Sequence, residues 1–180
     1  MGNRSSWRLL DPLEYETVWD QFREKFGFRA DIRASGWPAI REPTPSITFD
    51  LSGIPEGPRF ASAVAAINTE ALRCFVWVMP DIAELLVLDW NHEAYWLKPE
   101  LESLLPPEDP INGHPTVHPN GDYYSFLNPD MTEGTFGHPW EQSICVMGQR
   151  LIDSLGKSFA LWLPVLRVNG VPVTQPMASE

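Results

Sequence analysis

Residues 121–148 read GDYYSFLNPDMTEGTFGHPWEQSICVMG, a segment that concentrates glycine, aromatic and ionisable residues. Residues 122–128 (DYYSFLN) have the composition and alternation of a β-strand. Successive side chains of a strand point to opposite faces, so Tyr123 and Tyr124 are expected on opposite faces of a sheet. The segment therefore predicts a strand with aromatic side chains on both of its faces.

The residues that follow Trp140 fit either a helical stripe of apolar side chains or a second strand. The run Ile144-Cys145-Val146 favours the strand. Gly148 would destabilise a helix interior by about 1 kcal/mol. We therefore predict a strand over residues 141–147 and a short helix over residues 149–155.

The first helix is indicated by its capping residues. Asp11 is placed to cap the N-terminus, Pro12 suits the first helical position, and Glu14 completes an Asp-x-x-Glu capping box. Gly27 is placed to end the helix in a left-handed conformation. Aromatic side chains recur at helical spacing in between and are expected to face the core: Tyr15, Trp19, Phe22 and Phe26.

Further elements are indicated elsewhere in the chain. Gly57-Pro58 opens a second helix. Residues 165–173 (VLRVNGVPV) predict a hairpin, because Asn-Gly favours a type I′ turn. Apolar or alternating runs predict strands at residues 46–51, 74–79, 85–90 and 93–97 (SITFDL, CFVWVM, LLVLDW and EAYWL).

These elements predict a single α+β domain over residues 1–180. We expect a mostly antiparallel sheet of about five to seven strands, with two or three helices chiefly on one of its faces. A proline-rich segment at about residues 99–121 is expected to form a long loop.

The formal net charge is −11, and residues 61–180 hold fifteen acidic but only five basic side chains. Such a field repels nucleic acid and attracts a basic partner, although acidity that only aids solubility would give the same count. The eight tryptophans indicate either a thick aromatic core or a binding surface. The sequence does not fix the oligomeric state.

Both cysteines, Cys74 and Cys145, lie in apolar runs and are expected to be buried free thiols. This usage is typical of a reducing compartment, and we predict a cytoplasmic protein. No apolar segment reaches the length of a membrane span, and no nucleotide-binding or zinc motif occurs. We therefore expect no membrane association and no cofactor.

Three histidines, His114, His118 and His138, flank the strand predicted at residues 122–128. Two of them with Asp122 or Glu141 would match a two-histidine, one-carboxylate metal site. However, the first two histidines each precede a proline, which disfavours a helical arrangement of their side chains. We therefore expect no metal.

His138 and Glu141 form a stronger pair for acid–base chemistry, because imidazole titrates near neutral pH and a nearby carboxylate can orient it. The structural alternative is that His138 bonds a backbone carbonyl, Trp140 fills the core and Glu141 caps loop amides. Both interpretations stay open at this stage.

The strings GDYYSFL and GTFGHPWEQSICVMG resemble a bacterial family of uncharacterised proteins, domain of unknown function 2716. The similarity is strongest over residues 88–155, and the terminal VLRVNG is also similar. The resemblance implies a small, soluble α+β protein and supplies no catalytic residue. Its emphasis falls on Asp122, Tyr123, His138, Trp140 and Glu141, which fits either a shared site or a shared structural corner.

The first functional hypothesis is a non-enzymatic acidic binding module, such as an inhibitor or immunity-type protein that captures a basic protein. Its warrant is the negative charge of residues 61–180 together with the supply of tryptophan. The expected contact residues are Asp89, Trp90, Glu93, Trp96, Glu108, Asp109 and Glu133.

The alternative is a small cofactor-independent enzyme acting on a small molecule in an aromatic pocket. In it His138 is the general acid and base, Glu141 orients the imidazole, and the loop at residues 99–121 is a lid. The candidate binding residues are Asp122, Tyr123, Tyr124, Trp140, His118, Trp90 and Trp96.

Overall fold

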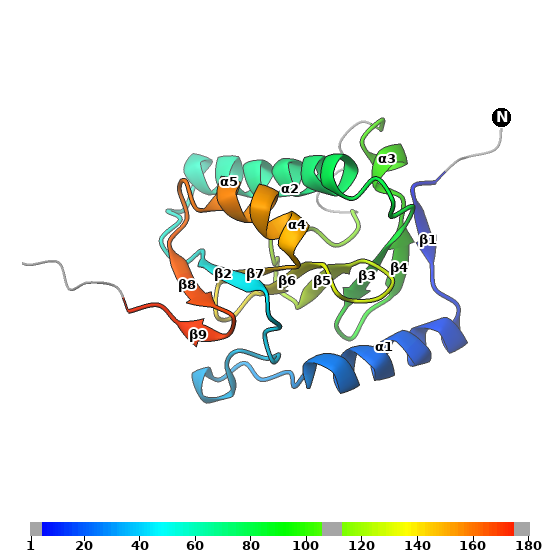
Figure 1. Ribbon diagram of the computed structural model, residues 1–180, viewed down its shortest axis with the longest axis horizontal. Coiled ribbons are helices and arrows are strands. Elements are labelled where there is room, and N and C mark those ends of the chain that lie inside the picture. Colours follow the sequence, from blue (N-terminus) through cyan, green and yellow to red (C-terminus); the bar gives the residue numbers. More distant parts are fainter. Residues whose placement is uncertain (1–4, 106–112, 175–180) are drawn as a thin grey trace, which may run out of the picture.

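The computed structural model describes residues 5–105 and 113–174. Within them, nine strands form one antiparallel sheet in the order β1-β4-β3-β5-β6-β7-β2-β8-β9 (Figure 1). The strands are β1 (Trp7–Leu9), β2 (Ser46–Asp50), β3 (Leu85–Asp89), β4 (Ala94–Leu97), β5 (Tyr124–Leu127), β6 (Gly134–His138), β7 (Ser143–Met147), β8 (Val165–Val168) and β9 (Val171–Pro172). The α+β class and the antiparallel sheet are confirmed, but the sheet is larger than the five to seven strands predicted.

The helical segments lie on both sides of the sheet, with α1 on one side (Figure 1), and they outnumber the two or three helices predicted. In Figure 1, α1 runs beneath the sheet, whereas α2, α4 and α5 lie above it. The segments are α1 (Pro12–Phe26), η1 (Ala34–Gly36), α2 (Pro58–Val78), α3 (Pro99–Glu102), α4 (Gln149–Leu151), the π-helical turn η2 (Ile152–Gly156) and α5 (Lys157–Phe159).

Two hydrophobic cores result, one on each face of the sheet. Along β3, Leu85 and Val87 belong to the core beneath α2, while Leu86 and Leu88 belong to the core above α1. We call these the α2-side core and the α1-side core. Because the strand is covered on both faces, its sequence is apolar throughout rather than alternating with polar residues.

The local signals of α1 are confirmed. The Asp11 side chain accepts hydrogen bonds from the backbone amides of Leu13 and Glu14, the capping box is complete, and Gly27 ends the helix in a left-handed conformation. The β8–β9 turn is also confirmed, because Asn169 and Gly170 both have positive φ, as a type I′ turn requires.

The strand predicted at residues 74–79 is wrong, because this run is the C-terminal part of α2. Ile67, Ala71, Cys74 and Phe75 are buried at helical spacing along one face of that 21-residue helix. A run that is apolar in every position is compatible with a buried strand and with a buried helix end, and here the period of the preceding residues continues through it.

Three further differences concern shorter segments. β1 and β6 were not predicted, since β1 is short and β6 (GTFGH) contains two glycines. The helical path that starts at α4 continues through Gly156, which has helical dihedral angles, to Phe159. In the predicted loop, α3 forms one short turn, and residues 106–112 lie outside the described part of the chain.

Two other predictions concern the burial of the cysteines and the presence of a membrane-spanning helix. Cys74 and Cys145 are free and buried, as predicted. In residues 5–105 and 113–174, no helix combines the length and the hydropathy that crossing a membrane requires.

Gly134, at the start of β6, is expected to tolerate no side chain. It has a φ of 153°, and an added Cβ would lie 2.0 Å from the carbonyl oxygen of Phe126. We predict that Gly134→Ala lowers the free energy of unfolding by about 3 kcal/mol or more, measured by urea denaturation. Gly53→Ala is the control, since nothing lies within 4 Å of its added Cβ, and it should change stability by less than about 0.5 kcal/mol. Equal losses in the two variants would contradict the prediction.

Candidate functional site

His138 is the last residue of β6 and lies inside the α1-side core region. Its partner in the β6–β7 hairpin is Ser143, and only 1% of its surface is exposed. The hairpin turn contains Gln142 in a left-handed conformation, which brings the chain back into β7. The chain therefore turns at His138–Glu141 as predicted for the candidate site, but the imidazole of His138 is buried away from solvent.

Aromatic rings enclose the imidazole. The ring centroid of Tyr123 lies 4.8 Å away, that of Trp37 lies 5.5 Å away, and both rings are close to perpendicular to it. Phe136 and Trp140 complete the enclosure at 6.4 and 6.3 Å. The Tyr123 hydroxyl is anchored by donating to the backbone carbonyl of Asp31 at 3.0 Å.

The backbone of Glu141, rather than its carboxylate, orients His138. The Glu141 backbone N–H donates to His138 Nδ1 at 3.0 Å, so Nε2 carries the hydrogen of the neutral ring. Nε2 has no hydrogen-bond partner among the described residues. Burial is the main cause that lowers the pKa of His138 to about 4, and nearby Arg167 acts in the same direction.

The Glu141 carboxylate forms a buried ion-pair network with Arg167 of β8. The Arg167 guanidinium donates to both carboxylate oxygens of Glu141 at 2.7 Å, and its Nε donates to Glu42 at 2.9 Å. The side chains of Arg167, Glu141 and Glu42 are 8%, 8% and 2% exposed. Burial alone would raise the pKa of Glu141, but the bonds from Arg167 and Ser143 outweigh it, and the pKa is lowered.

The other residues of the predicted aromatic pocket are divided between the two faces. Tyr123 belongs to the α1-side core with His138, whereas Tyr124 packs on the α2-side core. His118 is buried next to Phe60 of α2, and its backbone amide donates to Asn68. Hence the structure does not bring His118 or Tyr124 into contact with His138.

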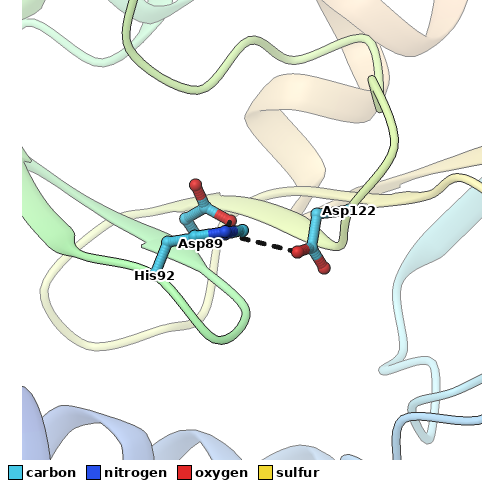
Figure 2. Close-up of side chains that lie close together, drawn as sticks. All are labelled: Asp89, His92 and Asp122. Atoms are coloured by element: carbon cyan, nitrogen blue, oxygen red, sulfur yellow. Dashed lines mark hydrogen bonds and ion pairs between the residues drawn. The ribbon is translucent and has the colours of Figure 1, made fainter.

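Asp122 lies in a second cluster, with Asp89 and His92 (Figure 2). His92 Nδ1 is 3.0 Å from Asp89 Oδ1 and 3.4 Å from Asp122 Oδ2. The hydrogen bond to Asp89 raises the pKa of His92, and partial burial raises the pKa of both carboxyl groups. The sequence signal that could have revealed it is the Asp-x-x-His spacing at the end of β3.

Two tryptophans connect this cluster to the His138 corner. Trp90, which follows Asp89, meets the Tyr123 ring at 5.6 Å and the Trp140 ring at 6.3 Å, and both indoles are partly exposed. Glu93 is exposed in the same β3–β4 turn. We call Asp89, Trp90, Glu93, Asp122 and Trp140 the acidic aromatic surface.

The remaining predicted contact residues lie elsewhere. Trp96 packs against the α1-side core, and Glu133 is ion-paired with Arg150. Glu108 and Asp109 lie outside the described residues. Sequence reasoning missed Trp37, Glu42 and Arg167, which are close to His138 or Glu141 only because the chain folds back onto them.

We predict that acid destabilises the protein through His138. The unfolded histidine has a pKa of about 6.5 and the folded one about 4, so only the unfolded chain takes up this proton in between. The contribution is complete above about pH 6.5 and is lost as the pH falls towards 4, by about 2 kcal/mol between pH 7 and pH 5. His138→Asn, whose Oδ1 can replace Nδ1 as acceptor, should show a correspondingly smaller loss in urea unfolding. The same pH dependence in both proteins would contradict this.

We also predict that Arg167→Met lowers the free energy of unfolding by about 3–5 kcal/mol, because it leaves two buried carboxylates without a counter-charge. The triple variant Glu42→Gln, Glu141→Gln and Arg167→Met removes those charges and should recover much of the loss. Urea denaturation at pH 7 measures both. A loss below about 1 kcal/mol for the single variant would show that the network is dispensable.

Comparisons with known proteins indicate the family to which the chain belongs. The chain is 26% identical over 155 residues to the uncharacterised protein YxiI of Bacillus subtilis (strain 168), an alignment that covers 83% of this chain and 92% of that protein. No solved structure matches. The sequence profile of a protein family of unknown function, DUF2716, matches residues 9–152, and the chain therefore belongs to this family.

Proposed function

We propose that the protein is a non-enzymatic binding module that captures a basic protein partner through the acidic aromatic surface. The observation that carries the proposal is that three carboxylates and two partly exposed indoles lie close together. They come from the segments next to the ends of β3 and β6 and the start of β5. An inhibitor or immunity-type role, in which the module masks a basic surface of its partner, is the concrete form of this function.

Charge supports the proposal. Several acidic side chains elsewhere in the described chain are paired with arginine, as in Glu14 with Arg8 and Glu70 with Arg73. In contrast, no lysine or arginine of the described residues pairs with a carboxylate of the acidic aromatic surface, where the counter-charge is His92. A lysine or arginine from a partner would supply the missing charge and would be steered there by the net charge of the chain.

The indoles support the same partner chemistry. Trp90 and Trp140 lie edge to face at 84°, and both rest on Tyr123. An aromatic face next to a carboxylate binds an arginine or lysine side chain by cation–π attraction together with an ion pair. Tryptophan is also enriched among the residues that dominate binding energy at protein interfaces.

The enzymatic alternative receives less support from the geometry. A general acid and base must reach its substrate, and His138 is 1% exposed behind four aromatic rings. The carboxylate expected to orient it is instead held by Arg167.

We predict that the acidic aromatic surface determines partner affinity. A photo-crosslinking residue at Trp90 should capture a basic protein in producing cells, whereas the same residue at exposed Leu13 of α1 should not. With that partner, Asp89→Asn/Asp122→Asn should weaken binding by about tenfold or more and reduce its salt dependence, measured by calorimetry.

Glu16→Gln/Asp20→Asn is the matched control, because it removes two exposed charges from α1 and should leave affinity within about twofold. A captured partner that is acidic, or equal affinities of the two double variants, would overturn the proposed function.

A further inference from the structure

We propose that Asp89, His92 and Asp122 form a binding site for a divalent transition-metal ion, with Zn²⁺ as the preferred ion. The proposal does not depend on the proposed function, since it concerns the isolated protein. It differs from our expectation of no metal, which considered only a site formed by His114, His118 or His138 with Asp122 or Glu141.

The spacing of the donor atoms suits a single ion. His92 Nδ1 lies 3.0 Å from Asp89 Oδ1 and 3.4 Å from Asp122 Oδ2, and the three ligand atoms lie within 4.8 Å of one another. Tetrahedral ligands bound to zinc at about 2.0–2.1 Å stand about 3.3–3.4 Å apart. Small rotations of the side chains drawn in Figure 2 therefore bring the three atoms around one ion.

The sheet positions the two carboxylates before any ion binds. Asp89 ends β3 and pairs with Tyr124 at the start of β5, and Asp122 lies two residues before that strand. The Tyr123 backbone amide donates to Asp122 Oδ1 at 2.8 Å, which leaves Oδ2 directed at His92. Such a bond to the non-ligating atom is the usual way in which a protein orients a metal ligand.

The cluster also lacks a permanent counter-charge. The Asp89 and Asp122 side chains are each 14% exposed, and among residues 5–105 and 113–174 their ion-pair partner is His92, which is 58% exposed. Two shielded carboxylates therefore share one titratable imidazole. A dication between them replaces that weak neutralisation with two full positive charges.

The donor set selects the kind of ion. An imidazole nitrogen with two carboxylates suits zinc, manganese or iron, whereas magnesium prefers oxygen ligands and retains its water. Three protein ligands leave a fourth tetrahedral position open. Because the His92 side chain is 58% exposed, water or a group of another molecule can reach the cluster and complete the coordination.

The test is calorimetric titration of the purified full chain with zinc chloride at pH 7.5. We expect one saturable site, and a weakening of at least about tenfold in His92→Gln and in Asp122→Asn. The matched control is Glu93→Gln, which removes a negative charge from the same turn but no ligand and should keep the wild-type affinity. Co²⁺ substitution provides a second readout, with visible absorption bands that His92→Gln abolishes.

Absence of saturable zinc binding would overturn the proposal. So would an equal loss of affinity in Glu93→Gln and Asp122→Asn, because that result indicates diffuse attraction by acidic charge. Equal affinity for Mg²⁺ and Zn²⁺ would also contradict it. Because both proposals use the carboxylates of Asp89 and Asp122, partner affinity is measured in the presence of a chelator, so that a loss in the Asp-to-Asn double variant is separated from loss of zinc.

Discussion

Burial of both faces of one sheet is the constraint on which the other features depend. β3 places Leu85 and Val87 under α2 and Leu86 and Leu88 over α1, and β7 divides its side chains in the same way. Antiparallel sheets commonly leave one face to solvent, and this one does not. A charged side chain buried beside the central strands therefore needs its counter-charge inside the protein, as Glu141 has in Arg167.

The two candidate sites differ in burial: the His138 corner is covered by the rest of the protein, whereas the cluster of Asp89, His92 and Asp122 is partly exposed. The His138 corner lies within the covered part of the sheet, so the Glu141 carboxylate is neutralised by Arg167. At the end of β3 the covering layers stop, and Asp89 has an exposed histidine and two partly exposed indoles as neighbours. The buried pair of Glu141 and Arg167 can only act within the fold, whereas the partly exposed carboxylates of Asp89 and Asp122 remain available to another molecule.

Features that depend on neighbours in sequence could be predicted, and features that depend on distant ones could not. The Asp11 cap and the Asn169-Gly170 turn follow from local chemistry, and both are present. The run at residues 74–79 was predicted wrongly, because it is apolar at every position, including the exposed Trp77, and so shows no period that separates helix from strand. Arg167 is 26 residues from Glu141, and only the pairing of β8 with β2 brings the two together.

The partner of Glu141 has a consequence for where this protein can be divided. The family profile ends at residue 152, yet Phe159 and Leu163 fill the α2-side core and Arg167 comes from a strand further on. A chain that ends at the family boundary would expose apolar surface. It would also leave the buried carboxylates of Glu42 and Glu141 without their counter-charge. The recurrent segment of the family is thus shorter than the cooperative folding unit, and domain boundaries for expression belong beyond β9.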